Sequence, residues 1–318
     1  MLPSVLRPAE TDHVPVLADD VRRLLAVRPG ETVVDATFGA GGHAALLAAD
    51  LRGEGKLIAI DRDPDVRPYF ERFRRSTAAQ VRLLRGDFSI VLRQLADNGV
   101  EADAVLLDLG VSSMQIDRPE RGFSYSVDAP LDMRMDSTAE LTAADLVNDS
   151  DERELASIFR AYGEERYARQ IARAIVRERR RHTLERTGEL VEVIRAAIPA
   201  PARFGEGHPA KRVFQALRIA VNDELNAVEA ALPAAFQMLR PGGRLAVISF
   251  HSLEDRIVKR FLREGERGCT CPSDFPICAC GKKPVLRALG RKAIRPSARE
   301  VAANPRAASA RLRAAVKI

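Results

Sequence analysis

The sequence predicts an α/β protein in which a parallel sheet covered by helices is interrupted by an all-helical domain. Three observations predict this fold class. Short apolar runs alternate with helical stretches over the first third of the chain, which is the pattern of βαβ units. A stretch of about a hundred residues without a convincing strand comes next, and a further apolar run follows it. The 318-residue chain is 46% hydrophobic, which is sufficient for about two domains with sizeable cores.

The predicted strands of the first third are continuous apolar runs, as expected for strands that helices cover on both faces. They are Thr32–Thr37, Lys56–Ile60, Val81–Leu84 and Ala104–Leu109. Each run ends in or beside Asp, Gly or Phe, and α/β proteins bind their ligands outside the carboxyl ends of the strands. We therefore expect the functional site at this edge of the sheet.

The helical domain is predicted over residues 113–219, where apolar residues recur at helical spacing. The sheet domain is consequently discontinuous and comprises residues 1–112 and 220–318. A long helix over Asn222–Leu239 leads back into it, and a Pro-Gly-Gly turn at 241–243 marks the end of that helix.

The last part of the chain adds strands to the predicted sheet. Arg244–Phe250 is the fifth strand, and Val285–Leu289 and Ala310–Ile318 are weaker candidates. This part is also basic: from Asp255 onward there are 16 Lys and Arg against five Asp and Glu, whereas the preceding residues carry a net negative charge. Such a distribution favours a polyanionic partner, although a solvated surface is the alternative.

Composition excludes several classes of protein. No apolar run approaches the roughly 18 residues that cross a bilayer, so no membrane helix is expected. The first ten residues contain no extended apolar stretch, so a cleaved secretory signal is not expected either. Four cysteines cannot form a disulfide scaffold in a chain of this length, which favours a cytoplasmic location.

A glycine-rich turn follows the first predicted strand and opens a helix. It reads Asp35-Ala-Thr-Phe-Gly39-Ala-Gly41-Gly42-His43, and closely spaced glycines let a ligand approach the backbone. Asp61 ends the next strand, where a carboxylate accepts hydrogen bonds from ribose hydroxyls. These features predict a cofactor that contains a nucleoside. The order of the glycines departs from the G-x-G-x-x-G fingerprint, which disfavours an NAD-dependent oxidoreductase.

The turn is similar to motif I of the class I (Rossmann-like) S-adenosylmethionine-dependent methyltransferases, in which an acidic residue precedes the glycines. Asp87 and Phe88, after the third strand, occupy the position that flanks the adenine in that superfamily. A helix N-cap is the alternative for Asp87, and a core position is the alternative for Phe88. Asp108 ends the fourth strand at the position of motif IV, where the methyl donor meets its acceptor.

A carboxylate at Asp108 suits the methylation of an exocyclic amine. It can accept one hydrogen of the amine, which localises electron density on nitrogen and orients it for in-line attack. A helix cap is the alternative role of this residue. No cysteine lies near motif IV, so we expect direct transfer without a covalent intermediate between enzyme and base.

Six further segments resemble one family, the bacterial 16S ribosomal RNA (cytosine-N4)-methyltransferases known as MraW or RsmH. They are Leu109–Ser113, Arg121–Ser124, Pro130–Asp136, Tyr162–Glu165, His208–Leu225 and Ile248–Asp255. These segments occur in both predicted domains and in the order of the family. The resemblance extends from about His13 to Ala315.

The resemblance implies N4-methylation of a cytidine in the decoding region of the small ribosomal subunit, near the P site. It implies S-adenosylmethionine as methyl donor and 16S rRNA, or the small subunit, as partner. Contacts with the methyl donor are implied for Gly41, Gly42, His43, Asp61, Phe88, Asp108 and Gln115. His43 as a mere cap of the following helix is the alternative, and no catalytic role is assigned to it.

Phe250 and His251 end the fifth strand, at the same sheet edge as Asp108, and are candidate acceptor-site residues. An aromatic ring there can stack on an extruded base, and His251 or Ser252 can bond its edge. A core position is the alternative for Phe250. Weaker candidates for substrate contact in the insertion are Tyr125, Arg134 and the basic run Arg177–Arg181.

Two other functions stay open at this point. One is a methyltransferase that acts on DNA or a small molecule, although Leu109–Val111 departs from the Pro-Pro-aromatic turn of DNA N4-methyltransferases. The other is a non-catalytic RNA-binding factor of ribosome assembly, against which the filled set of cofactor positions argues. The oligomeric state is also open, and a homodimer is one of the alternatives.

All four cysteines lie between residues 269 and 280, which scattered core cysteines would not do. They are Cys269, Cys271, Cys278 and Cys280. Four thiolates can form a tetrahedral structural zinc site, although structural zinc sites usually separate paired cysteines by two to four residues, and here one residue separates them. A redox-labile or unligated cluster is the alternative. With four thiolate ligands the metal would brace the chain and perform no chemistry.

Overall fold

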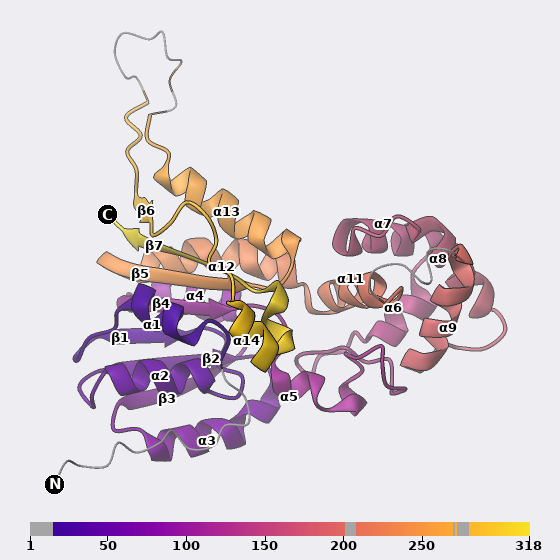
Figure 1. Ribbon diagram of the computed structural model, residues 1–318, viewed down its shortest axis with the longest axis horizontal. Helices are drawn as coiled ribbons and strands as arrows, with labels where there is room; N and C mark the ends of the chain where they lie inside the picture. Colours follow the sequence, from indigo (N-terminus) through magenta and orange to yellow (C-terminus); the bar gives the residue numbers. More distant parts are fainter. Residues whose placement is uncertain (1–14, 201–207, 270, 272–279) are drawn as a thin grey trace. The chain divides into compact units, whose positions relative to one another are not determined.

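The structure is a computed structural model and describes residues 15–200, 208–269, 271 and 280–318 (Figure 1). The chain forms two compact units. One combines Met1–Gly110 with Leu225–Ile318, and the other is Val111–Glu224. The boundaries predicted from sequence are 112/113 and 219/220.

The first unit contains a seven-stranded sheet with the order β3-β2-β1-β4-β5-β7-β6. Strands β1 to β5 are parallel, and β7 is antiparallel to both of its neighbours. The strands are β1 (Thr32–Asp35), β2 (Lys56–Asp61), β3 (Gln80–Arg85), β4 (Ala102–Asp108), β5 (Leu239–Ser249), β6 (Leu286–Ala288) and β7 (Arg311–Lys317). The order 3-2-1-4-5 is that of the doubly wound fold, so the predicted Rossmann-like class is confirmed.

Helices cover both faces of this sheet (Figure 1). One face packs against α4, α12 and α13 in a continuous apolar core that includes Val34, Val105 and Val247. Helices α1 and α2 contact the sheet on its other side. The helical segments of this unit are α1 (Ala18–Leu25), α2 (Gly42–Asp50), η1 (Pro64–Val66), α3 (Arg67–Ser76), α4 (Phe88–Asp97), α12 (Glu224–Met238), α13 (Ser252–Glu266), α14 (Ala298–Ala303) and η3 (Pro305–Ser309).

The second unit is helical, and its described residues contain no strand, only an isolated bridge between Pro130 and Arg186. It has a separate apolar core around Leu155, Phe159 and Ile171. Its helical segments are α5 (Ser113–Ile116), η2 (Pro119–Arg121), α6 (Ala143–Asp149), α7 (Glu152–Gly163), α8 (Ala168–Glu178), α9 (Thr187–Ala197) and α11 (Lys211–Asn222). In the described parts of both units, no helix combines the length and the apolar character needed to cross a membrane.

Two details correct the expected elements. The long helix does not begin at Asn222, which ends α11; Asp223 is left-handed (φ 51°), and α12 starts at Glu224. The fifth strand begins at Leu239 instead of Arg244, because Leu239 already pairs with Ala102. The Pro-Gly-Gly segment therefore lies within β5, where the register with β4 shifts and residues 240–242 are exposed.

Candidate active site

Three strands of the sheet end in aspartates at one edge. Asp35 ends β1, Asp61 ends β2 and Asp108 ends β4. Strands β2 and β4 flank β1 and are parallel to it, so their carboxyl ends meet where α/β proteins bind ligands. The edge therefore gathers three carboxylates from separate parts of the chain.

The glycine turn closes over this edge from the end of β1. The backbone amide of Gly39 donates a hydrogen bond of 2.7 Å to Oδ2 of Asp61. Gly41 has a φ of 83°, and a Cβ atom there would lie 2.8 Å from the Phe38 ring, which itself packs against Phe70. Glycine is thus required at position 41 by the backbone conformation and by internal packing, and not only for the approach of a ligand.

Asp61 connects β2 to the glycine turn. Its Oδ1 accepts a hydrogen bond of 2.9 Å from the amide of Asp63, while Oδ2 accepts from Gly39. Burial raises the pKa of Asp61 to about 6, against the opposing effect of these two hydrogen bonds. The carboxylate is therefore held rigidly by backbone amides of the glycine turn and of the residues that follow β2.

Asp108 is held by its backbone, and its carboxylate is left available. Its amide donates a hydrogen bond of 2.6 Å to Oγ1 of Thr37, and its side chain is 25% exposed. Oδ1 has no hydrogen-bond partner among the described residues. Burial raises the pKa of Asp108 to about 8, with further contributions from the negative charges of Asp35 and Glu254. The capping alternative is wrong, because the N-cap of the next helix is Ser112.

Asp35 belongs to the same electrostatic cluster and was not among the predicted site residues. Its side chain is fully buried, and within the described structure Oδ2 has no hydrogen-bond partner. Burial raises its pKa to about 7, and the charge of Asp61 adds to this effect. Its place at a strand end, like that of Asp61 and Asp108, is the signal from which sequence reasoning could have included it.

No lysine or arginine in the described parts of the chain forms an ion pair with these three aspartates. Of the described basic side chains, His43 alone lies at ion-pair distance, from Asp108, and burial lowers its pKa to about 4, so that it is neutral near pH 7. A set of buried carboxylates with raised pKa values is relieved by a positive charge and opposed by a negative one. The edge is accordingly suited to a cationic ligand.

His43 lies in the first turn of α2 and is 7% exposed. It does not cap the helix, so that alternative is wrong: the N-cap position is Gly41, and no side chain bonds there. Neither ring nitrogen has a hydrogen-bond partner in the described structure. An imidazole of this kind, buried at the site with both nitrogens unused, is available to a ligand.

Asp87 and Phe88 begin α4. Asp87 is the N-cap of this helix and accepts a hydrogen bond of 2.8 Å from the amide of Ser89, so the capping alternative is confirmed for it. Phe88 is half-buried and packs partly against the core of the sheet. Gln115 belongs to the helical unit, where it forms a capping box with Ser112.

The candidate acceptor residues follow β5. A Cβ atom on Gly110, two residues after Asp108, would lie 3.6 Å from the half-buried ring of Phe250. His251 is the N-cap of α13, and its Nε2 lies 3.2 Å from Oε1 of Glu254, although the geometry is not that of a hydrogen bond. Glu254 is 1% exposed and also accepts a hydrogen bond of 2.8 Å from the amide of Phe250.

Glu254 is thus a second residue that sequence reasoning did not single out. The signal was present, since His251 and Glu254 have the spacing of a capping box, but histidine is not a usual N-cap residue. Buried beneath the turn, the carboxylate fixes the Phe250–His251 backbone beside the end of β4.

The weaker candidates in the helical unit have structural partners. Tyr125 stacks on His208 at 4.5 Å between ring centroids, and Arg134 binds Asp132 through Nε and Nη2. Within the run Arg177–Arg181, Arg179 donates hydrogen bonds to the carbonyls of Val147 and Ser150. The structure therefore gives these three side chains roles within their own unit.

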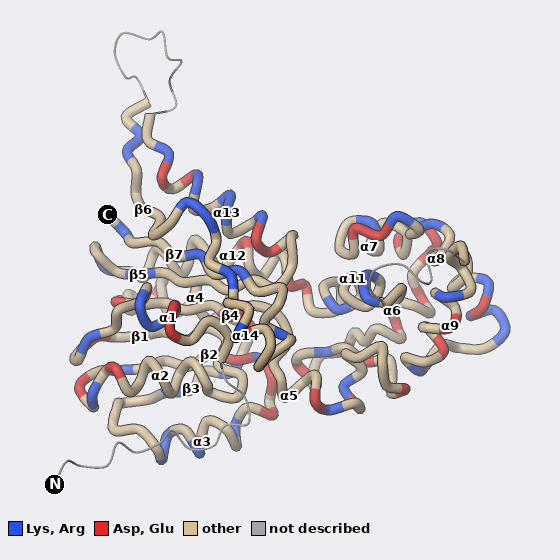
Figure 2. Tube along the Cα trace, in the orientation of Figure 1, with Lys and Arg blue, Asp and Glu red and all other residues tan. Residues whose placement is uncertain are grey.

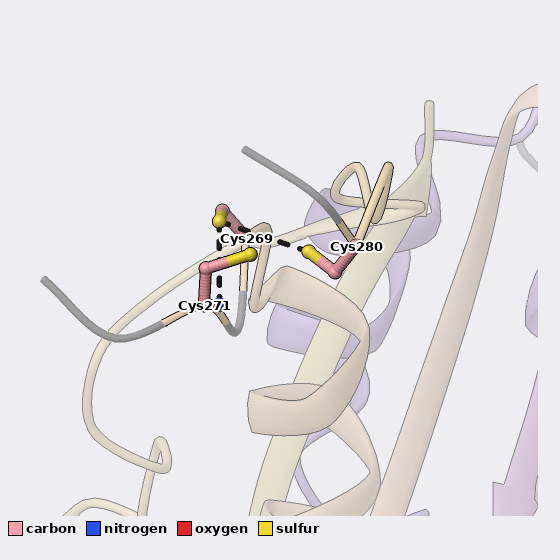
Figure 3. Close-up of side chains that lie close together, drawn as sticks. All are labelled: Cys269, Cys271 and Cys280. Carbon is pink, nitrogen blue, oxygen red and sulfur yellow. Dashed lines mark hydrogen bonds between the residues drawn. The ribbon is translucent and has the colours of Figure 1, made fainter. Parts of the chain in front are cut away.

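Three of the four cysteines lie together beyond the end of α13 (Figure 3). Their Sγ atoms are all within 4.8 Å of one another, and those of Cys269 and Cys280 are 3.7 Å apart. This separation is much longer than a disulfide bond of about 2.05 Å. The amide of Cys271 also donates to Sγ of Cys269. Cys278 lies outside the described residues.

Comparison with known proteins identifies the family of this chain. The model of the MraW methylase family matches residues 10–318. The chain belongs to this family. Three relatives named Ribosomal RNA small subunit methyltransferase H come from Heliobacterium modesticaldum (54% identity, 96% of this chain and 98% of the relative), Symbiobacterium thermophilum (54%, 96% and 96%) and Heliobacterium mobile (51%, 97% and 100%). The similarity covers both units of this MraW-family chain, and the resemblance seen in its motifs is confirmed.

Proposed function

We propose that the chain transfers a methyl group from S-adenosylmethionine to small-subunit ribosomal RNA, at N4 of a cytidine in the decoding region. One observation favours S-adenosylmethionine as the cofactor: the cluster of Asp35, Asp61 and Asp108 has no cationic partner among the described residues. Membership of the MraW methylase family and the names of the relatives support the reaction and the substrate.

The cluster distinguishes between the two cofactors that a Rossmann-like edge usually binds. S-adenosylmethionine carries positive charge on its sulfonium and its ammonium group, so it would relieve the repulsion among three buried carboxylates. The pyrophosphate of a dinucleotide would add negative charge beside them. Buried polar atoms of Asp35, His43 and Asp108 without described partners supply further groups for the ligand.

Each implied cofactor residue has a role in this proposal. Asp61 would accept the ribose hydroxyls, while Gly41, Gly42 and His43 would line the donor site along the turn and the start of α2. Phe88 would flank the adenine from the start of α4. The remaining implied contacts are Asp108 and, from the helical unit, Gln115.

Bound S-adenosylmethionine would supply an electrophilic methyl group, and its C–S bond would break as cytosine N4 forms the new N–C bond. Asp108 has the free Oδ1 needed to accept a hydrogen of the exocyclic amine and to orient it. The extra proton on nitrogen would leave to Asp108 or to water after transfer. The Thr37 hydrogen bond fixes the backbone of Asp108, so the carboxylate starts from a defined position at the end of β4.

Phe250 is the residue that we propose as a stacking surface for the target base, with His251 beside it. The ring lies next to Gly110 at the end of β4, and Glu254 holds the turn that presents it. The helical unit, predicted as residues 113–219, would recognise the RNA around the target. A substrate in the small ribosomal subunit would put the reaction in the cytoplasm. Tyr125 and Arg134 have partners in their own unit, and substrate contacts at these two residues stay predictions.

Incubation with labelled S-adenosylmethionine and small subunits that lack the modification tests the function. We expect labelled N4-methylcytidine after nucleoside analysis of the 16S rRNA. Label that appears only as a C5-methylated base, only in DNA or only in a small molecule would contradict the proposal. Light scattering on the purified protein, without subunits, distinguishes a monomer from a homodimer.

We also propose that the cysteines hold a structural zinc ion. Four thiolates at about 2.3 Å from a tetrahedral zinc lie about 3.8 Å from one another, close to the 3.7 Å between Cys269 and Cys280. The N–H···S bond from Cys271 stabilises a thiolate, as a metal ligand requires. Cys278 would be the fourth ligand, and a complete set of thiolates leaves no position for water or substrate.

A further inference from the structure

Helix α13 carries a row of cations on its solvent face. Arg256, Lys259, Arg260, Arg263 and, at the C-cap, Arg267 are all exposed. Spacings of three and four residues place them within about a third of the helix circumference, over a length of about 17 Å. In Figure 2 several blue segments lie along α13. We name these five residues the basic face.

The opposite side of the same helix fixes it to the core. Ile257, Val258 and Leu262 are buried in the main apolar cluster, and Asp255 binds Arg311 and Arg313 of β7 at 2.7–3.2 Å. The apolar packing and the ion pairs of Asp255 therefore hold α13 in one orientation, with the basic face toward solvent.

Charge neutralisation within the chain is incomplete on this face. Arg260 pairs with Glu229 at 2.5 Å, but the described structure contains no ion pair for Lys259, Arg263 or Arg267. Glu264 and Glu266 also line the surface hollow along this face, so two carboxylates there oppose five cations. Like charges at i, i+4 destabilise a helix, and an anionic ligand removes that cost.

The segment that leads into β6 extends the basic face. The amide of Val285 donates to the carbonyl of Gly265, and a Cβ atom on Gly268 would lie 3.9 Å from the carbonyl oxygen of Lys282. The exposed Lys282 and Lys283 are consequently attached to a backbone that runs beside the end of α13.

From these observations we infer that the basic face of α13 binds the phosphate backbone of the ribosomal RNA substrate, outside the methyl-transfer site. The inference rests on the proposed function for the identity of the polyanion. A rigid row of Lys and Arg about 17 Å long matches several successive phosphates, and phosphate contacts position a nucleic acid without specifying its sequence. Its contribution is to affinity and to the salt dependence of binding.

The test compares three variants of the full-length protein. The first is Lys259→Ala/Arg263→Ala/Arg267→Ala, which removes the three cations without an ion pair. The second, Lys259→Arg/Arg263→Lys/Arg267→Lys, keeps the charge. The third, Arg72→Ala/Arg75→Ala/Arg93→Ala, removes three exposed cations from α3 and α4.

Binding to unmodified small subunits is measured by filter binding over a range of salt concentrations, and methylation is measured on the same subunits. For the first variant we expect KM for subunits to rise tens of fold near 0.15 M salt. The slope of the logarithm of the association constant against the logarithm of the salt concentration should fall in magnitude by about 2, because each lost phosphate contact contributes roughly 0.7–0.9. Binding of S-adenosylmethionine should stay unchanged in all three, because none of these residues lies at the carboxyl edge.

An unchanged KM and salt slope in the first variant, or equal losses in the first and third, would overturn the inference while leaving the proposed function intact. Failure of the wild-type protein to methylate the subunits at all would instead contradict the proposed function. If the first variant loses binding to vesicles of anionic lipid but not to subunits, the basic face serves a membrane and the inference is wrong.

Discussion

Nε2 of His43 lies 3.5 Å from Oδ2 of Asp108, yet neither His43 nitrogen has a hydrogen-bond partner in the part of the chain that the structure describes. Burial lowers the pKa of the imidazole to about 4 and raises that of the carboxyl to about 8, so near pH 7 both groups are mostly neutral. This contact does not form the ion pair that its distance suggests. Among the described residues no side chain supplies a positive charge to Asp108, and a cationic ligand would supply one.

Binding of S-adenosylmethionine should therefore release protons. A cation beside the three aspartates lowers their raised pKa values, and at pH 7 Asp35 and Asp108 are the groups that still hold protons. Calorimetry in buffers of different ionisation enthalpy measures the number released. We expect up to about one proton per carboxyl that titrates near pH 7, and fewer for Asp108→Asn. Net proton uptake would contradict the electrostatic account of the site.

The ligand-free protein should lose stability as pH rises. In the unfolded chain Asp108 titrates near 3.8, whereas in the folded protein it titrates near 8, so the folded state binds more protons between these values. Stability then falls with increasing pH across this window. Asp108→Asn removes the contribution, and its Tm should exceed that of the wild type by a margin that grows from pH 5 to pH 8. A margin independent of pH would exclude this cause.

Asp108→Asn should reduce turnover more than it reduces cofactor affinity. The amide keeps the shape of the side chain but cannot accept a proton from the amine, and loss of such a group typically costs 10²-fold or more in rate. Single-turnover methylation at saturating S-adenosylmethionine measures this step separately from binding. Normal turnover at saturation would show that the carboxylate has no part in the mechanism.

Asp61→Ala should mainly weaken cofactor binding. The substitution removes the proposed ribose acceptor together with the hydrogen bonds from Gly39 and Asp63, and a lost charged hydrogen bond of roughly 1.5–3 kcal/mol corresponds to about 10- to 100-fold in Kd. Calorimetric titration with S-adenosylmethionine gives the affinity. Asp97→Ala, at an exposed position of α4, is the matched control and should bind as the wild type does.

Reduced protein purified without chelator should contain about one zinc ion per chain. Cys271→Ser/Cys280→Ser should remove the metal, measured by elemental analysis, and leave the affinity for S-adenosylmethionine nearly unchanged, because the cysteines lie beyond the far end of α13 from the site. Lys282→Ala/Lys283→Ala is the control that keeps the thiolates. Wild-type protein without zinc, and with the same protease resistance in the presence and absence of chelator, would defeat the proposal.

Much of the sheet was predictable from sequence because buried parallel strands are continuous apolar runs. The bounds expected for β1 to β4 agree with the structure within two residues. The start of β5 was not predictable, since Leu239 pairs with Ala102 across a long stretch of chain and a Pro-Gly-Gly segment follows it. The pairing with a distant strand therefore outweighs the Pro-Gly-Gly segment, which would usually end a strand.

The parts of the site that lie at strand ends or in the glycine turn were predictable from sequence. Asp61 and Asp108 lie at the edge where βαβ logic places them, but the burial and coupling of Asp35 depend on the packing of three strands. Sequence spacing also could not show that Phe38 requires glycine at position 41, or that Glu254 holds the turn before α13. These are contacts between segments that only tertiary structure brings together.

Asp108 and Ile248 are partners in adjacent strands although 140 residues separate them, because the helical unit interrupts the chain between β4 and β5. Closing a flexible loop of that length costs on the order of 4 kcal/mol in chain entropy. If the helical unit folds first, most of this loop is already ordered when the two strands meet. The rate at which the catalytic sheet closes should then depend on the stability of a unit that contributes no strand to it.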